Sequence, residues 1–131
     1  MSDSNSWADY ISMVRGKGVL ALELYVVHSK PTGGLDGVRA NHGPHLAYQK
    51  EIEQKGIMFG AGPLADERGQ EWSGEGFIII RAPSLEAARE IADNDPMHKN
   101  GGRTYTIRPW LLNEGCLNIE LTFSDGGRKI T

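Results

Sequence analysis

Two residues of this 131-residue chain combine a reactive side chain with a position that local structure does not favour. His45 falls in the first turn of a predicted helix, where the positive end of the helix dipole disfavours a protonated imidazole. Asp95 falls at the C-terminal end of a second predicted helix, which is the unfavourable end for a carboxylate. Because residues that break a local rule are candidates for function, we consider His45 and Asp95 for proton transfer. The structural alternative is that Asp95 only caps the following turn and His45 is a surface residue.

Two further histidines extend this pattern into spacings that could hold a metal ion. His42 precedes His45 by three residues, and His98 follows Asp95 by three residues. Two histidines and one carboxylate are a plausible ligand set. His42, however, comes before Gly43-Pro44, where we expect the helix not to have begun, so an i, i+3 geometry is not expected. We therefore predict no metal site and place His42 and His98 either beside the substrate or in exposed loops.

Several charged side chains could bind a substrate. Three arginines could hold a carboxylate through bidentate contacts: Arg39, Arg103 and Arg108. We prefer Arg108 because it alternates with a threonine and a tryptophan on one face of a predicted strand, although each arginine could equally be an ion-paired surface residue. Glu23 interrupts an apolar strand and is either a carboxylate of the pocket or a buried partner of an arginine.

The rest of the sequence excludes several functional classes. Fourteen basic and 17 acidic residues give a net charge of −3 without a basic block, so we do not expect a nucleic-acid partner. The segment Gly60-Ala61-Gly62 lacks the third glycine of a dinucleotide-binding loop, and we predict no cofactor.

The location of the protein is predicted from what the sequence lacks. The lone Cys116 excludes an internal disulfide and suits a reducing compartment. No apolar run approaches the roughly 18 residues that span a bilayer, and the first residues do not resemble a signal peptide. We therefore predict a cytoplasmic protein without a membrane partner.

Hydrophobic patterning predicts the elements that must position these residues. The expected helices cover residues 6–15, 45–55 and 85–95, and the expected strands cover 19–28, 57–61, 77–81, 104–112 and 117–123 before a polar tail. The central order, strand, helix, strand, strand, helix, strand, is that of the ferredoxin-like unit. We thus predict an α+β fold with an antiparallel sheet and two helices on one face.

A sheet covered on one face leaves its other face open. Both faces of the first predicted strand are apolar, and we expect Val19, Ala21 and Tyr25 to lie on the open one. Such a patch is large for a monomer, so we predict a homodimer that pairs through the sheet faces.

A series of short motifs in the 18–115 segment carries a resemblance to a known family. They are His45-Leu46, Gly56-Ile57-Met58, Ala61-Gly62-Pro63-Leu64, Ser84-Leu85-Glu86-Ala87-Ala88, Asp95-Pro96-Met97 and Ile107-Arg108-Pro109-Trp110. In this order they resemble the YCII-related (YciI-like) family. The resemblance divides the chain into an N-terminal helical arm (1–17), the family domain (18–115) and a C-terminal strand extension with a tail (116–131).

The resemblance implies a dimeric α+β barrel with a pocket in which His45 meets Asp95. It also implies a small cofactor-independent enzyme of the lyase, isomerase or dehydrochlorinase type, because one family member removes chloride from a chlorinated hydroquinone. The expected substrate is a small oxygen-rich or aromatic-derived metabolite. The alternative is a non-catalytic, small-ligand-binding or stress-associated barrel protein.

Overall fold

The computed structural model of the chain describes residues 5–131. These residues form two compact units. Residues 23–110 make the larger unit, and residues 5–22 together with residues 111–131 make the smaller one.

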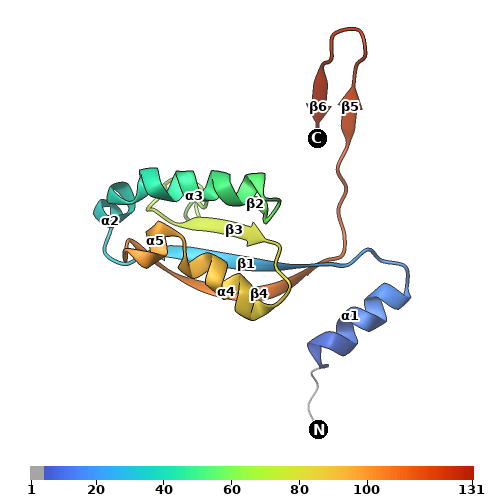
Figure 1. The fold of residues 1–131 in the computed structure, drawn as a ribbon, viewed down its shortest axis with the longest axis horizontal. Coiled ribbons are helices and arrows are strands. Elements are labelled where there is room, and N and C mark those ends of the chain that lie inside the picture. The colour runs from blue at the N-terminus through green and yellow to red at the C-terminus, as the bar shows by residue number, and fades with distance from the viewer. Residues whose placement is uncertain (1–4) are drawn as a thin grey trace. The chain divides into compact units, whose positions relative to one another are not determined.

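A four-stranded sheet forms the centre of the larger unit (Figure 1). Its strands are β1 (Leu22–Pro31), β2 (Met58–Pro63), β3 (Gly76–Ile80) and β4 (Arg103–Leu112), in the spatial order β2-β3-β1-β4. Strand β3 pairs antiparallel with both β1 and β2, and Ile78 lies opposite Val27 on one side and Ala61 on the other. The order of strands and helices confirms the predicted α+β, ferredoxin-like architecture.

Four helices belong to this unit: α2 (Leu35–Ala40), α3 (His42–Gln54), α4 (Leu85–Asp93) and α5 (Pro96–Lys99). Helices α3 and α4 pack on the same face of the sheet, because both contribute to one core with alternate residues of the strands. This core consists of Tyr25, Val27, Ile52, Ile78, Ile80, Ala88, Ala92 and Ile107. Helix α4 begins at the predicted cap, where the Ser84 hydroxyl accepts a hydrogen bond from the backbone N–H of Ala87 at 3.1 Å.

The prediction of which sheet face is open was wrong. Tyr25 is only 3% exposed and lies in the core beneath the helices. Val19 and Ala21 precede β1, and Ala21 has a positive φ of 46°. The strand begins after this residue, so an alternation counted through it does not hold. The face without helices instead carries Val26 and Ile79, which are paired across β1 and β3.

Two element boundaries also differ from the predictions. The segment 30–37, expected to be a loop, leads into α2, which begins at Leu35. Helix α3 begins at His42 and not at His45, because the carbonyl of Asn41 accepts a hydrogen bond from the backbone N–H of His45 at 3.0 Å and closes the first turn. Pro44 is tolerated there, since N–H groups of a first helical turn have no partner within the helix.

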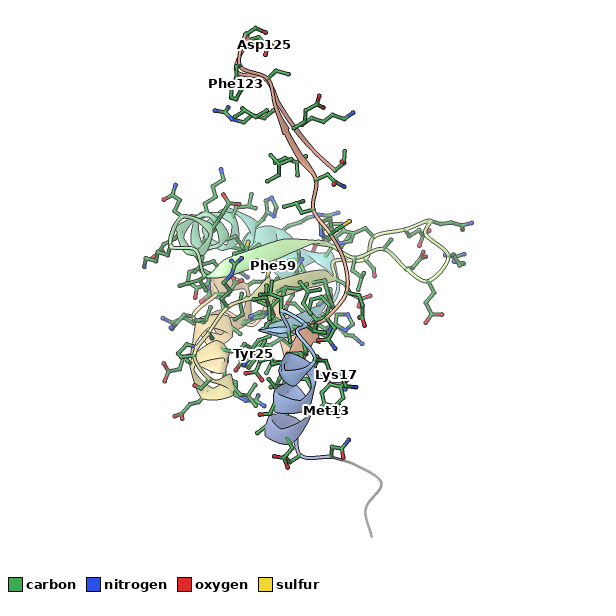
Figure 2. All side chains as sticks on the ribbon, turned by 90° about the vertical axis from the view of Figure 1, so that its right-hand side faces the viewer. Met13, Lys17, Tyr25, Phe59, Phe123 and Asp125 are labelled. Carbon is green, nitrogen blue, oxygen red and sulfur yellow. The ribbon has the colours of Figure 1, made fainter. Side chains whose placement is uncertain are left out.

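The smaller unit contains α1 (Trp7–Gly16) and a two-stranded hairpin of β5 (Ile119–Leu121) and β6 (Arg128–Ile130). Val14 and Ala21 pack with Leu111 in its core. Part of the segment expected to be a polar tail thus forms the second strand of the hairpin. Phe123 and Asp125 lie at its turn (Figure 2). Across residues 5–131, no helix is both long and apolar enough to cross a membrane.

Candidate active site

The side chains of His45 and Asp95 lie within hydrogen-bonding distance of each other in the larger unit. Nδ1 of His45 lies 2.8 Å from Oδ2 and 2.9 Å from Oδ1 of Asp95. His45 comes from the first turn of α3, as the sequence predicted. Asp95, however, is not the end of the preceding helix, because α4 ends at Asp93 and Asp95 is the N-cap of α5. Its Oδ1 accepts the backbone N–H of Met97 at 2.9 Å, so the carboxylate lies at the favourable end of a helix.

Asp95 is held by donors from two helices. Besides His45 and the backbone of Met97, Nε2 of Gln49 donates to its Oδ2 at 3.0 Å. The residue is only 2% exposed. Burial alone would raise the pKa of the Asp95 carboxyl, but the hydrogen bond and charge of His45, together with the Met97 N–H, hold it below its ordinary value. Asp95 is therefore a carboxylate at neutral pH.

This carboxylate determines which nitrogen of a neutral His45 carries the proton. Because Oδ1 and Oδ2 of Asp95 accept, Nδ1 of His45 must donate, and the lone pair is left on Nε2. The side chain of His45 is 13% exposed, and His45 lines a cavity. An arrangement of this kind can offer Nε2 as a proton acceptor, with the carboxylate as the counter-charge.

The cavity beside His45 has a volume of about 750 Å³, which suits a small molecule. Its walls come mainly from α3, β2 and β3 and from the loop between these two strands. Apolar side chains dominate the lining: Leu46, Met58, Ala61, Pro63, Ala65, Trp72 and Ile78. Six polar or charged side chains also line the cavity: His42, His45, Gln49, Lys50, Glu53 and Arg103. Such a lining can bind an apolar body against its apolar side chains and orient it through polar ones.

Of the two other predicted histidines, the structure brings one to the cavity. His42 is exposed and lies among the lining residues. His98 is not among the residues that line this cavity. Its Nδ1 donates to the carbonyl of Ala92 at 2.7 Å, and its Nε2 accepts from the Ser29 hydroxyl at 2.6 Å. Burial lowers the pKa of His98, so it is neutral at pH 7. With both nitrogens engaged, His98 supports the fold rather than contacting a ligand.

Arg108 and Glu23 are not among the residues that line this cavity. Arg108 lies on the opposite face of the sheet, where it borders a separate hollow of about 460 Å³ with Phe77 and Trp110. The arginine at the cavity is Arg103, which the sequence also offered and ranked lower. The signal that could have identified it is strand alternation, since Arg103 shares the core-facing side of β4 with Ile107.

Gln49 and Trp72 are among the lining residues that the sequence did not predict. Gln49 follows His45 by four residues on α3, and this spacing places both on one face of the helix. The sequence around Trp72 is polar and turn-rich and carried no signal. Within the described residues 5–131, no group of three or more histidine, cysteine, aspartate or glutamate side chains could hold a metal ion.

Comparisons with known proteins agree with this fold. A family model described as YCII-related domain matches residues 24–111. The structure is similar to that of 5-chloro-2-hydroxyhydroquinone dehydrochlorinase from Burkholderia phenoliruptrix in complex with 2,5-dihydroxybenzoquinone, with a TM-score of 0.56 and 25% sequence identity. The similarity covers 66% of this chain and 92% of the dehydrochlorinase. No curated protein sequence matches this chain.

Proposed function

This chain belongs to the YCII-related family, and on that premise we propose that it is a small-molecule enzyme in which His45 and Asp95 transfer protons. The observation that carries the proposal is the hydrogen bond from Nδ1 of His45 to the Asp95 carboxylate, which leaves Nε2 of the imidazole as a base at the cavity. The reaction is of the lyase or isomerase type. It uses the protein's own side chains, with Nε2 of His45 as general base and then general acid.

The similar dehydrochlorinase indicates a particular reaction, the loss of hydrogen chloride from a chlorinated hydroxyhydroquinone. The ring first takes up its keto form, in which one hydroxyl proton has moved to the carbon that carries chlorine. Nε2 of His45 then takes the proton of a second hydroxyl, the electron pair of this O–H bond forms a C=O bond, and the ring double bond shifts toward the chlorinated carbon. Chloride leaves with the electron pair of the C–Cl bond. Asp95 balances the charge of the imidazolium until His45 returns the proton to water.

The proposal is tested by mixing the full chain with 5-chloro-2-hydroxyhydroquinone and measuring chloride release against a protein-free blank. We expect release by the wild-type chain and a fall of about 10²- to 10⁴-fold in His45→Gln, as for removal of a general base. The matched control is His42→Gln, which changes a histidine at the same cavity outside the hydrogen-bonded pair. A His45→Gln variant as fast as the wild type contradicts the mechanism. A wild-type chain that binds the compound without releasing chloride favours the non-catalytic alternative.

We also propose that two copies pair through the sheet face that lacks helices. This face exposes Phe77 and Trp110, which are 36% and 37% exposed, beside Val26 and Ile79. Pairing would remove this apolar surface from water. Light scattering on the eluted protein should give the mass of a dimer, and Ile79→Lys should give that of a monomer. A wild-type monomer at tens of micromolar chain would contradict the pairing.

We retain the proposal of a cytoplasmic location. Cys116 is a free and exposed cysteine. An exposed thiol of this kind persists in a reducing compartment, whereas an oxidising one would favour its pairing with another thiol.

A further inference from the structure

Arg103 is a buried cation whose counter-charge is incomplete. The residue is 6% exposed, and its Nε donates to the carbonyl of Gly74 at 2.6 Å. None of the ion pairs found in residues 5–131 includes Arg103. Its Nη1 and Nη2 make no hydrogen bond within this described part of the chain, and they retain contact with solvent. These two nitrogens belong to a side chain that lines the cavity beside His45.

The nearby carboxylate does not neutralise this guanidinium fully. Asp95 favours the charged form of Arg103 from a distance, but burial acts more strongly and lowers the pKa of the guanidinium. The oxygens of Asp95 already accept from His45, Gln49 and the backbone of Met97. Because an arginine stays protonated in proteins, the cavity retains a cation with free donors. Buried charges are normally paired, so this one is suited to a partner that arrives with the ligand.

The backbone beside Arg103 leaves room for the guanidinium. Gly76 at the start of β3 is buried, and a Cβ atom at this position would lie 3.2 Å from Nη1 of Arg103. Any larger residue there would press on the guanidinium. Gly76 itself lines the same cavity.

We propose that Arg103 is the anion-binding residue of the cavity, and that its ligands are planar, negatively charged molecules such as aromatic carboxylates or ionised hydroxyquinones. This inference depends on the proposed function only because both use the cavity that His45 and Arg103 line. Nη1 and Nη2 form a planar fork that matches two oxygens of a carboxylate or of adjacent ring substituents. The indole of Trp72, which is 45% exposed at the same cavity, offers an apolar surface for the ring.

The test is calorimetric titration of the full chain with 2,5-dihydroxybenzoate, an anion, and with hydroquinone, its neutral counterpart. We expect the wild type to bind the anion more tightly. Arg103→Gln should weaken binding of the anion by at least about tenfold, the effect of losing a charge-assisted hydrogen bond, and leave binding of hydroquinone unchanged. The matched control is Arg108→Gln, which removes an arginine of the same strand on the opposite sheet face and should bind both probes as the wild type does.

Gly76→Ala provides a second route that leaves the arginine in place. The added Cβ should displace the guanidinium and reduce the preference for the anion even where Arg103→Gln does not fold, as judged by circular dichroism. The inference is overturned if the wild type shows no preference for the anion, or if Arg103→Gln or Gly76→Ala keeps the preference unchanged. His45→Gln separates this inference from the proposed function, because it should slow chloride release by about 10²- to 10⁴-fold while the preference for the anion over hydroquinone persists.

Discussion

Truncation of Asp95 tests whether this carboxylate organises the site. In Asp95→Ala, Nδ1 of His45, Nε2 of Gln49 and the backbone N–H of Met97 lose their common acceptor. The site is only 2% exposed, so water cannot replace every lost bond. An unpaired buried donor costs about 1–3 kcal/mol, but His45 and Gln49 border the cavity and can recover some hydration. We therefore expect a loss of about 3–5 kcal/mol in the free energy of unfolding at pH 7, the combined cost of three donors of which two are partly rehydrated.

Urea unfolding followed by circular dichroism measures this loss. A domain of this size has a total stability of about 5–15 kcal/mol, so Asp95→Ala is partly unfolded if that stability is at the low end. Asp95→Asn keeps the shape of the side chain and an acceptor for the Met97 N–H, and we expect a smaller loss of about 1–3 kcal/mol. The control is Glu90→Gln, an exposed carboxylate on α4, which should change the stability by less than about 0.5 kcal/mol.

The pH dependence separates the charge of Asp95 from its shape. The pKa of this carboxyl lies below 3.8 in the folded chain, so its ionisation contributes stability that is fully present above that pH. This contribution to stability is lost as the pH falls through the pKa that Asp95 has in the folded chain. The difference between wild type and Asp95→Asn should therefore shrink from pH 7 to about pH 3. An equal difference at both pH values, or a loss below about 1 kcal/mol for Asp95→Ala at pH 7, would refute this account of the site.

Three further predictions concern the buried polar groups around the pair. Folding lowers the pKa of His98 below 6.5, so the unfolded chain binds this proton at a higher pH than the folded chain does. The free energy of unfolding should therefore fall as the pH drops below about 6.5. His98→Gln should lose less of this free energy between pH 7.5 and 5.5, as measured by urea unfolding. Ser29→Ala removes the hydroxyl 2.6 Å from Nε2 of His98 and should cost about 1–3 kcal/mol in the same assay, because Ser29 is fully buried. Tyr48→Phe removes the hydrogen bond to the carbonyl of Ile91 at 2.6 Å and should cost about 1 kcal/mol by urea unfolding.

The sequence predicted the order of elements because each helix and strand carries its own periodicity and its own caps. It placed Asp95 wrongly because the helical spacing of apolar residues continues to Ala92 and the stop was assigned to the proline at position 96. A proline is also favoured at the first position of a helix, and aspartate is favoured as the N-cap before it. The pair Asp95-Pro96 therefore marks a helix start, and the carboxylate at this start is the one that reaches His45.

The choice between the two arginines of β4 depends on tertiary structure. Alternation assigns Arg103 and Arg108 to opposite faces, but it does not say which face the helices cover. Both faces of the neighbouring strand β1 are apolar over Leu24–Val27. Its pattern therefore does not show which face the helices cover either. The outcome is decided by the apolar residues of α3 and α4, which pack on the side of Tyr25 and Ile107.

The local role of Asp95 and its proposed chemical role depend on each other. Its Oδ1 accepts the N–H that begins α5, so the same helix start that fixes the chain also fixes the carboxylate. The imidazole of His45 is bound through Nδ1, so Nε2 is the nitrogen left for a ligand in the cavity that His45 lines. A structural cap and a functional partner, considered above as alternatives, are therefore compatible here. The orientation of the base follows from the turn between α4 and α5, and a substitution that moves this turn should affect proton transfer without touching the cavity.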